Sequence, residues 1–229
     1  MVRNLVTFFA LAICMNLNAQ IHEIGLTVGG ANSIGDVGPT TYIAPKDFGF
    51  GIQYKWNRSP RHSWRVSYLY TGISGKDADS DTGARRLRNL EFKNNIQEVS
   101  LGLEFNFFEF DLHNDWFAFT PYIYTGLAGL KFDQTYFNKS NNQVKFDDGY
   151  ALAIPLHIGV KALINKRFVL SAEVGARYAF TDNLDGNNPT NLDYTSYQFG
   201  NTMGKDWYVF SGISLSYTFG KNPCYCAPN

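Results

Sequence analysis

Charged residues are scarce in this sequence of 229 residues, and the opposite charges cancel. Asp, Glu, Lys and Arg together make up 17% of the chain, as 20 basic and 20 acidic residues. Nucleic-acid binding requires a basic face, which this balance does not favour. The four His residues, His22, His62, His113 and His157, are scattered and show no metal-ligand spacing. The sequence therefore predicts no nucleic-acid partner, no bound metal and no cofactor.

Long apolar runs are also missing, apart from one at the N-terminus. Leu5–Leu17 is mostly apolar and follows Arg3, but a transmembrane helix needs about 20 such residues. A positive residue, a short apolar segment and a small residue before the cut are typical of a secretory signal peptide. We predict a signal peptide of residues 1–19, ending at Ala19. An exported chain without a helical anchor is periplasmic, extracellular or a membrane barrel.

Cysteine is limited to three residues, and only Cys224 and Cys226 follow the predicted signal peptide. They lie in a tail of residues 220–229, beyond the last predicted strand. An oxidising compartment favours a disulfide, but a bridge between residues two apart is strained. Pairing of these thiols with another protein is therefore kept as an alternative.

Aromatic residues, in contrast, are abundant at 16%, with 14 Tyr and 19 Phe. They suit pleated, half-buried surfaces and membrane–water interfaces. Apolar and polar residues alternate with the period of a β-strand in most of eight segments. These segments are Ile24–Gly30, Phe48–Trp56, Trp64–Ile73, Val99–Phe107, Trp116–Phe132, Tyr150–Ile164, Phe168–Phe180 and Trp207–Phe219. Pro121 and Pro155 lie inside two of them and predict bulges, because proline cannot donate a ladder hydrogen bond.

The connections between these segments differ in length. Three are short: Asn57–His62, Phe108–Asp115 and Asn165–Arg167. Four are long and polar: Ala31–Pro45, Gly75–Lys93, Asp133–Gly149 and Asp182–Lys205. Short turns at one end and long loops at the other are typical of outer-membrane barrels. We therefore expect the chain in the outer membrane, with both termini and the short turns in the periplasm.

The polar faces of the predicted strands are small and carry matched charges. A barrel of eight strands has an interior only wide enough for side chains, and buried charges are tolerated when they are paired. The sequence thus predicts an all-β fold over residues 20–219: an eight-stranded antiparallel up-and-down transmembrane β-barrel with a plugged lumen. The predicted lumen ion-pair network comprises Glu23, Lys55, Arg65, Glu98, Glu104, Lys161, Glu173 and Arg177.

Two of these carboxylates, Glu98 and Glu104, also fit the residue types of an acid/base pair. Ion pairing in the lumen is the simpler interpretation, and His157 is expected as a hydrogen-bonded lumen residue rather than a base. We predict no catalytic residues, no enzyme activity and no small-molecule substrate. An outer-membrane enzyme acting on lipid is kept as a minor alternative.

The long loops carry further charges near the predicted outer rim. Their acidic residues have no His beside them in the sequence and are interpreted as solvated loop charges; they are Asp77, Asp79, Asp81 and Asp182. A short basic run leaves contact with lipopolysaccharide phosphates as an alternative; it consists of Arg85, Arg86 and Arg88.

Segments along most of the chain form a recognisable set. The most specific is HEIGLTVGGANSIGDVGPTTYIAPKDFGFGIQYKWN; the others are ISGKDADS, RNLEFKNNIQEVSLGLEFNFF, TPYIYTGLAG, AIPLHIGVKALINKRFVLSAEVGARYAFTDNLD, GKDWYVFSGISLSYTF and the Cys-bearing tail. From His22 to Cys224 the chain resembles the PorG-like outer-membrane barrels of the type IX secretion system of Bacteroidetes, a DUF6089-type family. The resemblance implies a non-enzymatic accessory subunit. It would anchor a periplasmic ring of PorK-like and PorN-like proteins to the outer membrane.

The resemblance supplies no binding motif at the level of residues. From the topology we infer that contacts with the ring use the periplasmic turns and the tail, with ordinary turn residues as the alternative interpretation. The predicted partner-binding residues are Arg58, Pro60, Arg61, His62, Asp111, His113, Asp115, Lys166, Arg167, Cys224 and Cys226. Outer-membrane lipid is the other expected partner. The alternative function is that of a small OmpA-like or OmpW-like barrel for uptake of apolar solutes or for surface adhesion.

Overall fold

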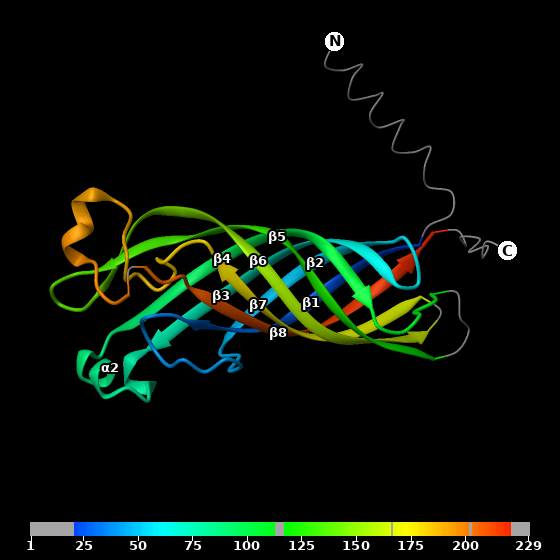
Figure 1. Cartoon of the computed structure of the whole chain (residues 1–229), viewed down its shortest axis with the longest axis horizontal. Helices are drawn as coiled ribbons and strands as arrows, with labels where there is room; N and C mark the ends of the chain where they lie inside the picture. The colour runs from blue at the N-terminus through cyan, green and yellow to red at the C-terminus, as the bar shows by residue number, and fades with distance from the viewer. Residues whose placement is uncertain (1–20, 113–116, 166, 202, 221–229) are drawn as a thin grey trace, which may run out of the picture.

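The computed structural model describes residues 21–112, 117–165, 167–201 and 203–220. Eight antiparallel strands follow one another around a closed barrel, which β1 completes by pairing with β8 (Figure 1). The strands are β1 (Ile21–Ile34), β2 (Asp47–Asn57), β3 (His62–Lys76), β4 (Glu91–Asn106), β5 (Ala118–Phe137), β6 (Gln143–Asn165), β7 (Phe168–Ala179) and β8 (Trp207–Phe219). The described connections include the helical segments η1 (Asp77–Asp79), α2 (Gly83–Arg88) and η2 (Leu192–Tyr197). The predicted all-β, eight-stranded, up-and-down barrel is confirmed.

The predicted signal peptide of residues 1–19 lies outside the described residues, as do Cys224 and Cys226 of the tail. Within the described part of the chain, no helix is long and apolar enough to cross a membrane. β1 begins and β8 ends at the same end of the barrel, because neighbouring strands run in opposite directions and their number is even.

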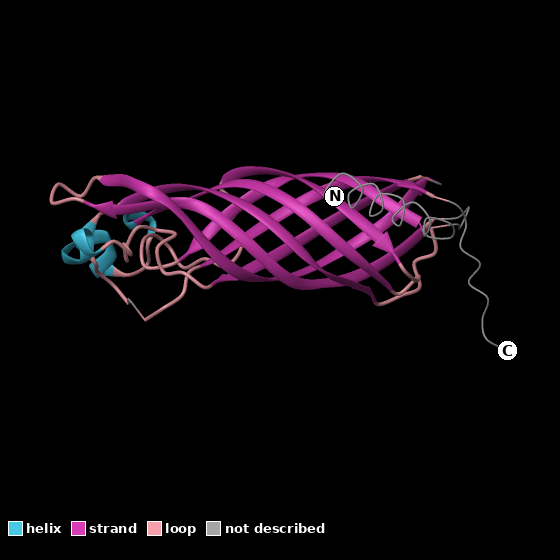
Figure 2. Ribbon diagram, turned by 90° about the horizontal axis from the view of Figure 1, so that it is seen from above, coloured by secondary structure: helices cyan, strands magenta, loops and turns pink. Residues whose placement is uncertain are grey.

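The two ends of the barrel differ in their connections (Figure 2). The turn end carries the connections 58–61, 107–117 and 166–167, and the loop end carries 35–46, 77–90, 138–142 and 180–206. The prediction of a long loop at Asp133–Gly149 is wrong, because β5 and β6 continue as paired strands through most of this segment. Contacts between the two strands stabilise this extension: Lys145 pairs with Asp133, and the Tyr136 ring lies against Phe146.

The two prolines lie in the ladder without the predicted bulges. Pro121 and Pro155 both keep the register of their neighbours. Pairing between β5 and β6 is instead interrupted opposite Pro155, which has no N–H group to donate. The register shifts occur elsewhere on β5 and β6, at Gln134 and at Leu163. Pro155 is thus accommodated by a local gap in pairing with β5, and Pro121 without one.

A belt of apolar side chains covers the outside of the barrel. It includes Ile24, Leu26, Val28, Ile52, Val66, Val99, Leu101, Leu103, Leu127, Leu152, Leu156, Ile158, Ile213 and Leu215. Leu26 and Ile158 are 67% and 63% exposed, although both lie within strands. Exposing a continuous belt of this kind to water is unfavourable, whereas a transmembrane barrel turns its apolar residues to lipid. The protein is therefore a transmembrane β-barrel of the outer-membrane type.

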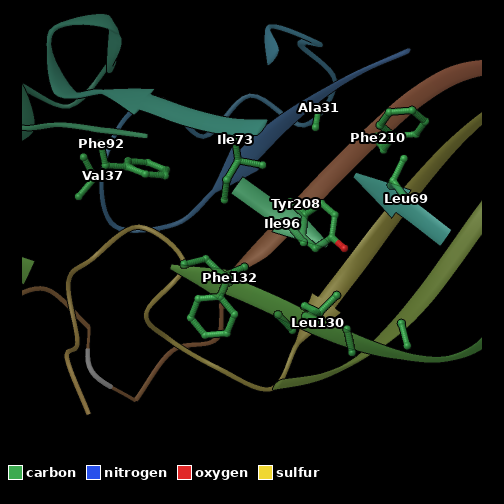
Figure 3. Packing of buried hydrophobic residues seen from close by; sticks show 14 of the residues in the cluster. Ala31, Val37, Leu69, Ile73, Phe92, Ile96, Leu130, Phe132, Tyr208 and Phe210 are labelled. Atoms are coloured by element: carbon green, nitrogen blue, oxygen red, sulfur yellow. The ribbon is translucent and has the colours of Figure 1, made fainter. Parts of the chain in front are cut away.

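Strand β4 shows that the barrel has two zones. Toward the turn end its outward residues are apolar, from Val99 to Phe105, while Glu98 and Glu104 point inward. Toward the loop end the pattern is reversed: Phe92 and Ile96 point inward, and the outward residues are polar. The loop-end zone therefore encloses a hydrophobic core like that of a soluble barrel (Figure 3). This core comprises Ala31, Val37, Leu69, Ile73, Leu90, Phe92, Ile96, Ala128, Leu130, Phe132, Phe137, Ala153, Ala179, Leu184, Tyr208 and Phe210.

Candidate functional site

The lumen of the membrane-spanning zone is filled by buried ion pairs, and Glu104 of β4 lies at the centre of one group. Its carboxylate oxygens are 2.5 Å from Lys161 Nζ and 2.8 Å from Lys55 Nζ. Arg65 Nη1 approaches the same carboxylate at 3.7 Å. All four side chains are buried, and they come from β2, β3, β4 and β6. One acid thus joins strands on opposite sides of the barrel.

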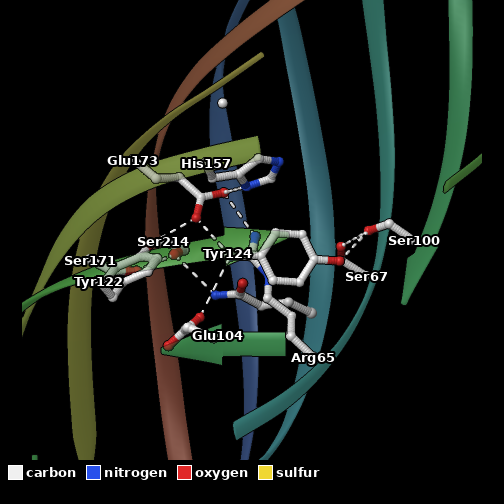
Figure 4. Close-up of polar contacts among 12 residues, drawn as sticks. Arg65, Ser67, Ser100, Glu104, Tyr122, Tyr124, His157, Ser171, Glu173 and Ser214 are labelled. Carbon is white, nitrogen blue, oxygen red and sulfur yellow. Dashed lines mark hydrogen bonds and ion pairs between the residues drawn. The ribbon is translucent and has the colours of Figure 1, made fainter. Parts of the chain in front are cut away.

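A second group surrounds Glu173 of β7 (Figure 4). The guanidinium of Arg65 donates two hydrogen bonds to its two oxygens, at 2.7 and 2.8 Å. Tyr122 Oη donates a third at 2.7 Å, and His157 Nδ1 lies 3.3 Å from the carboxylate. Such a two-pronged contact fixes both partners in orientation as well as distance. Because Arg65 also faces Glu104, it links the two groups into one network.

A third group lies closer to the loop end. Arg177 Nε donates to Glu98 at 3.0 Å, and Tyr208 Oη donates to the same carboxylate. Glu23 is the exception among the eight residues of the predicted network: it accepts a hydrogen bond from Asn57 Nδ2 at 2.9 Å rather than forming an ion pair. The structure therefore brings the other seven residues together in ion pairs.

The packing of these side chains leaves almost no free space. The cavity among Arg65, Glu98, Glu173 and Arg177 measures about 10 Å³, which is no more than one water molecule occupies. Buried charges of this kind are held in place by their partners, and Glu98, Glu104 and Glu173 each accept from more than one donor or lie beside several cations. The plugged lumen predicted from the sequence is confirmed, and the barrel contains no open pore through the described residues.

The turn end is closed by a segment that sequence reasoning treated as an ordinary short link. Phe110 and Leu112 fold under the barrel and are buried against Leu163 and Val169. The Phe110 N–H donates to Pro60 O at 3.1 Å, which ties this segment to the first turn. The signal that could have revealed it is the apolar content of residues 107–112, which is too high for a solvated turn.

The predicted partner-binding residues are partly described. Arg58 and Arg167 are exposed at the turn end; Arg58 lies over the Trp56 ring, and Arg167 donates to Tyr217 Oη at 3.2 Å. Arg61 is also exposed, and it donates to Phe107 O at 2.7 Å. These cations therefore share one surface at the turn end.

The other members of the predicted set are less informative. His62 is exposed and lies 2.7 Å from Ser59 Oγ, while Pro60 and Asp111 are half-buried. The remaining predicted residues lie outside the described part of the chain; they are His113, Asp115, Lys166, Cys224 and Cys226.

The loop end is closed by ordered loops, which corrects the prediction of solvated charges there. Asp79 and Asp81 are exposed, but Asp77 is fully buried. Arg88 donates to both oxygens of Asp77 at 2.7 and 2.9 Å, and Gly38 N–H donates to it at 3.0 Å. Burial acts to raise the pKa of Asp77, but these donors outweigh it and hold the pKa below its usual value.

The short basic run beside Asp77 stabilises the loops. Arg85 Nη1 donates to Gly38 O at 2.6 Å, and Arg86 Nη1 donates to Ser80 O at 2.8 Å. Arg88 reaches across to Asp36 O at 2.7 Å and lies over the Phe199 ring. Each of the three guanidinium groups therefore makes at least one contact within the loops, although Arg86 remains exposed.

Solved structures of small outer-membrane barrels are similar in outline. The N-terminal β-barrel domain of Pseudomonas aeruginosa OprF has 13% identity and a TM-score of 0.47, covering 88% of this chain and 98% of that chain. Neisserial surface protein A has 9% identity and a TM-score of 0.49, with 86% and 97% covered. Pseudomonas aeruginosa OprG has 12% identity and a TM-score of 0.42, with 89% and 98% covered. Because these TM-scores lie below 0.5, the fold is assigned from the strand pairing observed in this chain rather than from the similarity.

Sequence comparison identifies the family. No curated protein matches the chain significantly. A family model described as "Domain of unknown function (DUF6089)" matches residues 2–228, which include every strand of the barrel. A match over nearly the whole chain, together with the closed eight-stranded fold, establishes that the protein belongs to the DUF6089 family.

Proposed function

We propose that this barrel is a non-enzymatic outer-membrane subunit of a type IX protein secretion system. In this role it anchors a periplasmic ring of PorK-like and PorN-like proteins to the membrane. The support comes from the resemblance of residues 22–224 to PorG-like barrels and from the filled lumen. A barrel whose interior is occupied by Glu104, Glu173 and their partners offers only its outer surfaces for function.

The filled lumen is the observation that carries the proposal. Transport of a solute requires a route through the barrel, whereas ion pairs and the apolar loop-end core occupy both zones. An anchoring role needs only a lipid-facing belt and a surface for the partner. Uptake of apolar solutes has no comparable observation in its favour.

The turn end is the surface that we assign to the ring. In the proposed orientation it faces the periplasm, where β1 begins and β8 ends. It exposes the cations of Arg58 and Arg167 beside the membrane-spanning belt, together with Arg61, which lies near Glu109. Such a group fits an acidic surface on a periplasmic partner, since complementary charges steer association.

Site-specific photocrosslinking tests this assignment. A photoreactive phenylalanine derivative is placed at Arg58 or Arg167, with exposed Leu192 at the loop end as the matched control. We expect crosslinks to the ring proteins from the turn-end positions and none from Leu192. Deletion of the gene should release the ring from the outer-membrane fraction and reduce secretion of a type IX cargo. Retention of the ring and normal secretion in the deletion strain would refute the role.

A further inference from the structure

The connection 35–46, which joins β1 to β2, covers part of the outer wall of the barrel (Figure 1). The sign of this cover is the burial of Asn32 near the end of β1. Strand alternation places its side chain on the outer face, together with that of Val28. Val28 is 54% exposed, whereas Asn32 is only 5% exposed. An outward side chain that is buried to this extent lies beneath another part of the chain.

Residues 41–45, which we call the wall segment, provide the cover. Asn32 Nδ2 donates to Thr41 O at 2.8 Å, and Asn32 Oδ1 accepts from Ala44 N–H at 3.1 Å. One side chain of the barrel wall thus replaces the partners that the backbone of an irregular segment would otherwise take from water. The wall segment is therefore fixed against the outside of β1 rather than folded over the open end of the barrel.

Pro45 sets the height of the wall segment on the barrel. A side-chain carbon added to Gly30 would lie 2.9 Å from Pro45 Cβ, so glycine at position 30 allows this close approach. Gly30 is the next outward position after Val28 and pairs with Phe48 of β2. Phe48 is 69% exposed and continues the apolar outer surface of the barrel. The wall segment therefore begins where the lipid-facing belt ends.

Two large side chains of the wall segment have no cover of their own. Tyr42 and Ile43 are 76% and 60% exposed. They continue an exposed apolar surface, because Phe48 lies beside the wall segment and its ring is 6.4 Å from that of Phe50. Large apolar side chains gathered on a surface mark a place of interaction. Here the neighbouring surface is the belt, which already identifies lipid as the occupant.

Aromatic residues of nearby strands indicate the membrane–water interface at the same level. Trp207 of β8 is exposed, pairs with Ile34 of β1, and has its ring 4.9 Å from that of Tyr178 on β7. On β3, the Tyr70 ring lies 5.6 Å from that of Phe50. Trp and Tyr concentrate at this boundary in membrane proteins, because their rings are apolar and carry a polar group. The wall segment lies between these two groups of rings.

We propose that the wall segment is an interfacial anchor, which places Tyr42 and Ile43 among the headgroups and upper acyl chains of the lipid leaflet at the loop end. The tyrosine hydroxyl remains within reach of the headgroups while its ring and Ile43 leave water. Lipid contact of this kind requires a membrane barrel and is independent of any role in secretion. The anchor would keep the connection 35–46 on the wall of the barrel and attach the β1–β2 hairpin to the bilayer.

Fluorescence quenching in lipid vesicles tests the proposal. The cysteines Cys14, Cys224 and Cys226 are replaced by serine, and Ile43→Cys then carries the fluorophore NBD. The protein is refolded into phosphatidylcholine vesicles that contain a lipid with a nitroxide near the headgroup end of its acyl chain. Because interfacial residues lie about 5–10 Å into the boundary of headgroups and acyl chains, we expect quenching at least about twofold stronger than for the same label at Leu192→Cys. Leu192 is the matched control, since it is apolar and 85% exposed in another loop.

Further variants relate the quenching to the contacts on the wall. A label at Leu26→Cys, in the belt, shows the quenching of a lipid-facing position in the folded, heat-modifiable protein. Asn32→Ala removes the hydrogen bonds to the wall segment and should lower the quenching at position 43 toward the value at position 192. Asn191→Ala, which removes a hydrogen bond to Asp193 N–H in another loop, should leave it unchanged. Equal quenching at positions 43 and 192, with strong quenching at position 26, would place the wall segment in water and overturn the proposal. Unchanged quenching in Asn32→Ala would contradict the role given to the wall contact.

Discussion

Replacing Glu104 by glutamine should destabilise the barrel more than any substitution of an exposed acid. The glutamine keeps the shape of the side chain but removes the negative charge between Lys55 and Lys161. Each of these contacts contributes on the order of 6 kcal/mol of Coulomb attraction at an effective dielectric constant of about 20. Most of that attraction offsets the desolvation of the charges. Removing only the acid leaves Lys55 and Lys161 buried without their counter-ion. We therefore expect a loss of about 3–5 kcal/mol in unfolding free energy.

Equilibrium urea unfolding in lipid vesicles, followed by tryptophan fluorescence, measures this loss. Glu109→Gln is the matched control, because Glu109 is exposed and lies 3.4 Å from Arg61; its removal should change stability by less than about 1 kcal/mol. Lys161→Met in the Glu104→Gln background should recover part of the loss, since it removes one of the stranded cations. Equal stabilities of Glu104→Gln and Glu109→Gln would refute the reasoning that the lumen is held together by paired charge.

Three further predictions address other parts of the barrel. Gly102→Val should prevent formation of the folded band on gels of unheated samples, because a side chain at this position would collide with the Thr125 carbonyl. Phe110→Ala should lower the free energy of unfolding by about 3 kcal/mol through the cavity it leaves at the turn end, and urea unfolding would detect this loss. The loop end should lose protection from hydrogen exchange as the pH rises from about 4 to about 6. Burial raises the pKa of Asp185 to about 6, and burial together with repulsion from Asp185 raises that of Asp206, so protonation favours the closed form only below these values. Unchanged protection across this range, or the same pH dependence in Asp185→Asn, would contradict the last prediction.

The alternation of side chains predicted the barrel because lipid and lumen impose opposite demands on successive residues. This environment requires apolar residues on the lipid side and small or polar residues on the lumen side. Strand β4 shows the pattern, with Val99, Leu101 and Leu103 outward and Ser100, Gly102 and Glu104 inward. The same reasoning failed past residue 133, where β5 and β6 leave the membrane. There most residues are polar, including Asp133, Lys145 and Asp148, so the sequence of a strand resembles that of a loop.

The candidate sites could be predicted from the sequence less well than the fold. The alternation identified which charged residues face the lumen, but it could not show that Glu23 meets Asn57 rather than a cation. Nor could it show that Asp77 and Asp182 are buried, because their burial depends on how the irregular loops fold: Asp77 accepts from Arg88 of its own connection and from Gly38 of another. Long-range contacts between irregular segments leave no periodic signal. From the sequence alone, these acidic residues therefore cannot be told from solvated loop charges.

The reversal of faces along β4 fixes the height of the protein in the bilayer. Sliding toward the turn side would draw Lys93 and Gln97 into hydrocarbon, and sliding the other way would lift Val99 and Leu101 into water. Both displacements are opposed by transfer free energy, so a bilayer that is too thick or too thin must deform around the barrel rather than move it. Whatever binds the turn end is thereby held at a constant distance from the membrane surface.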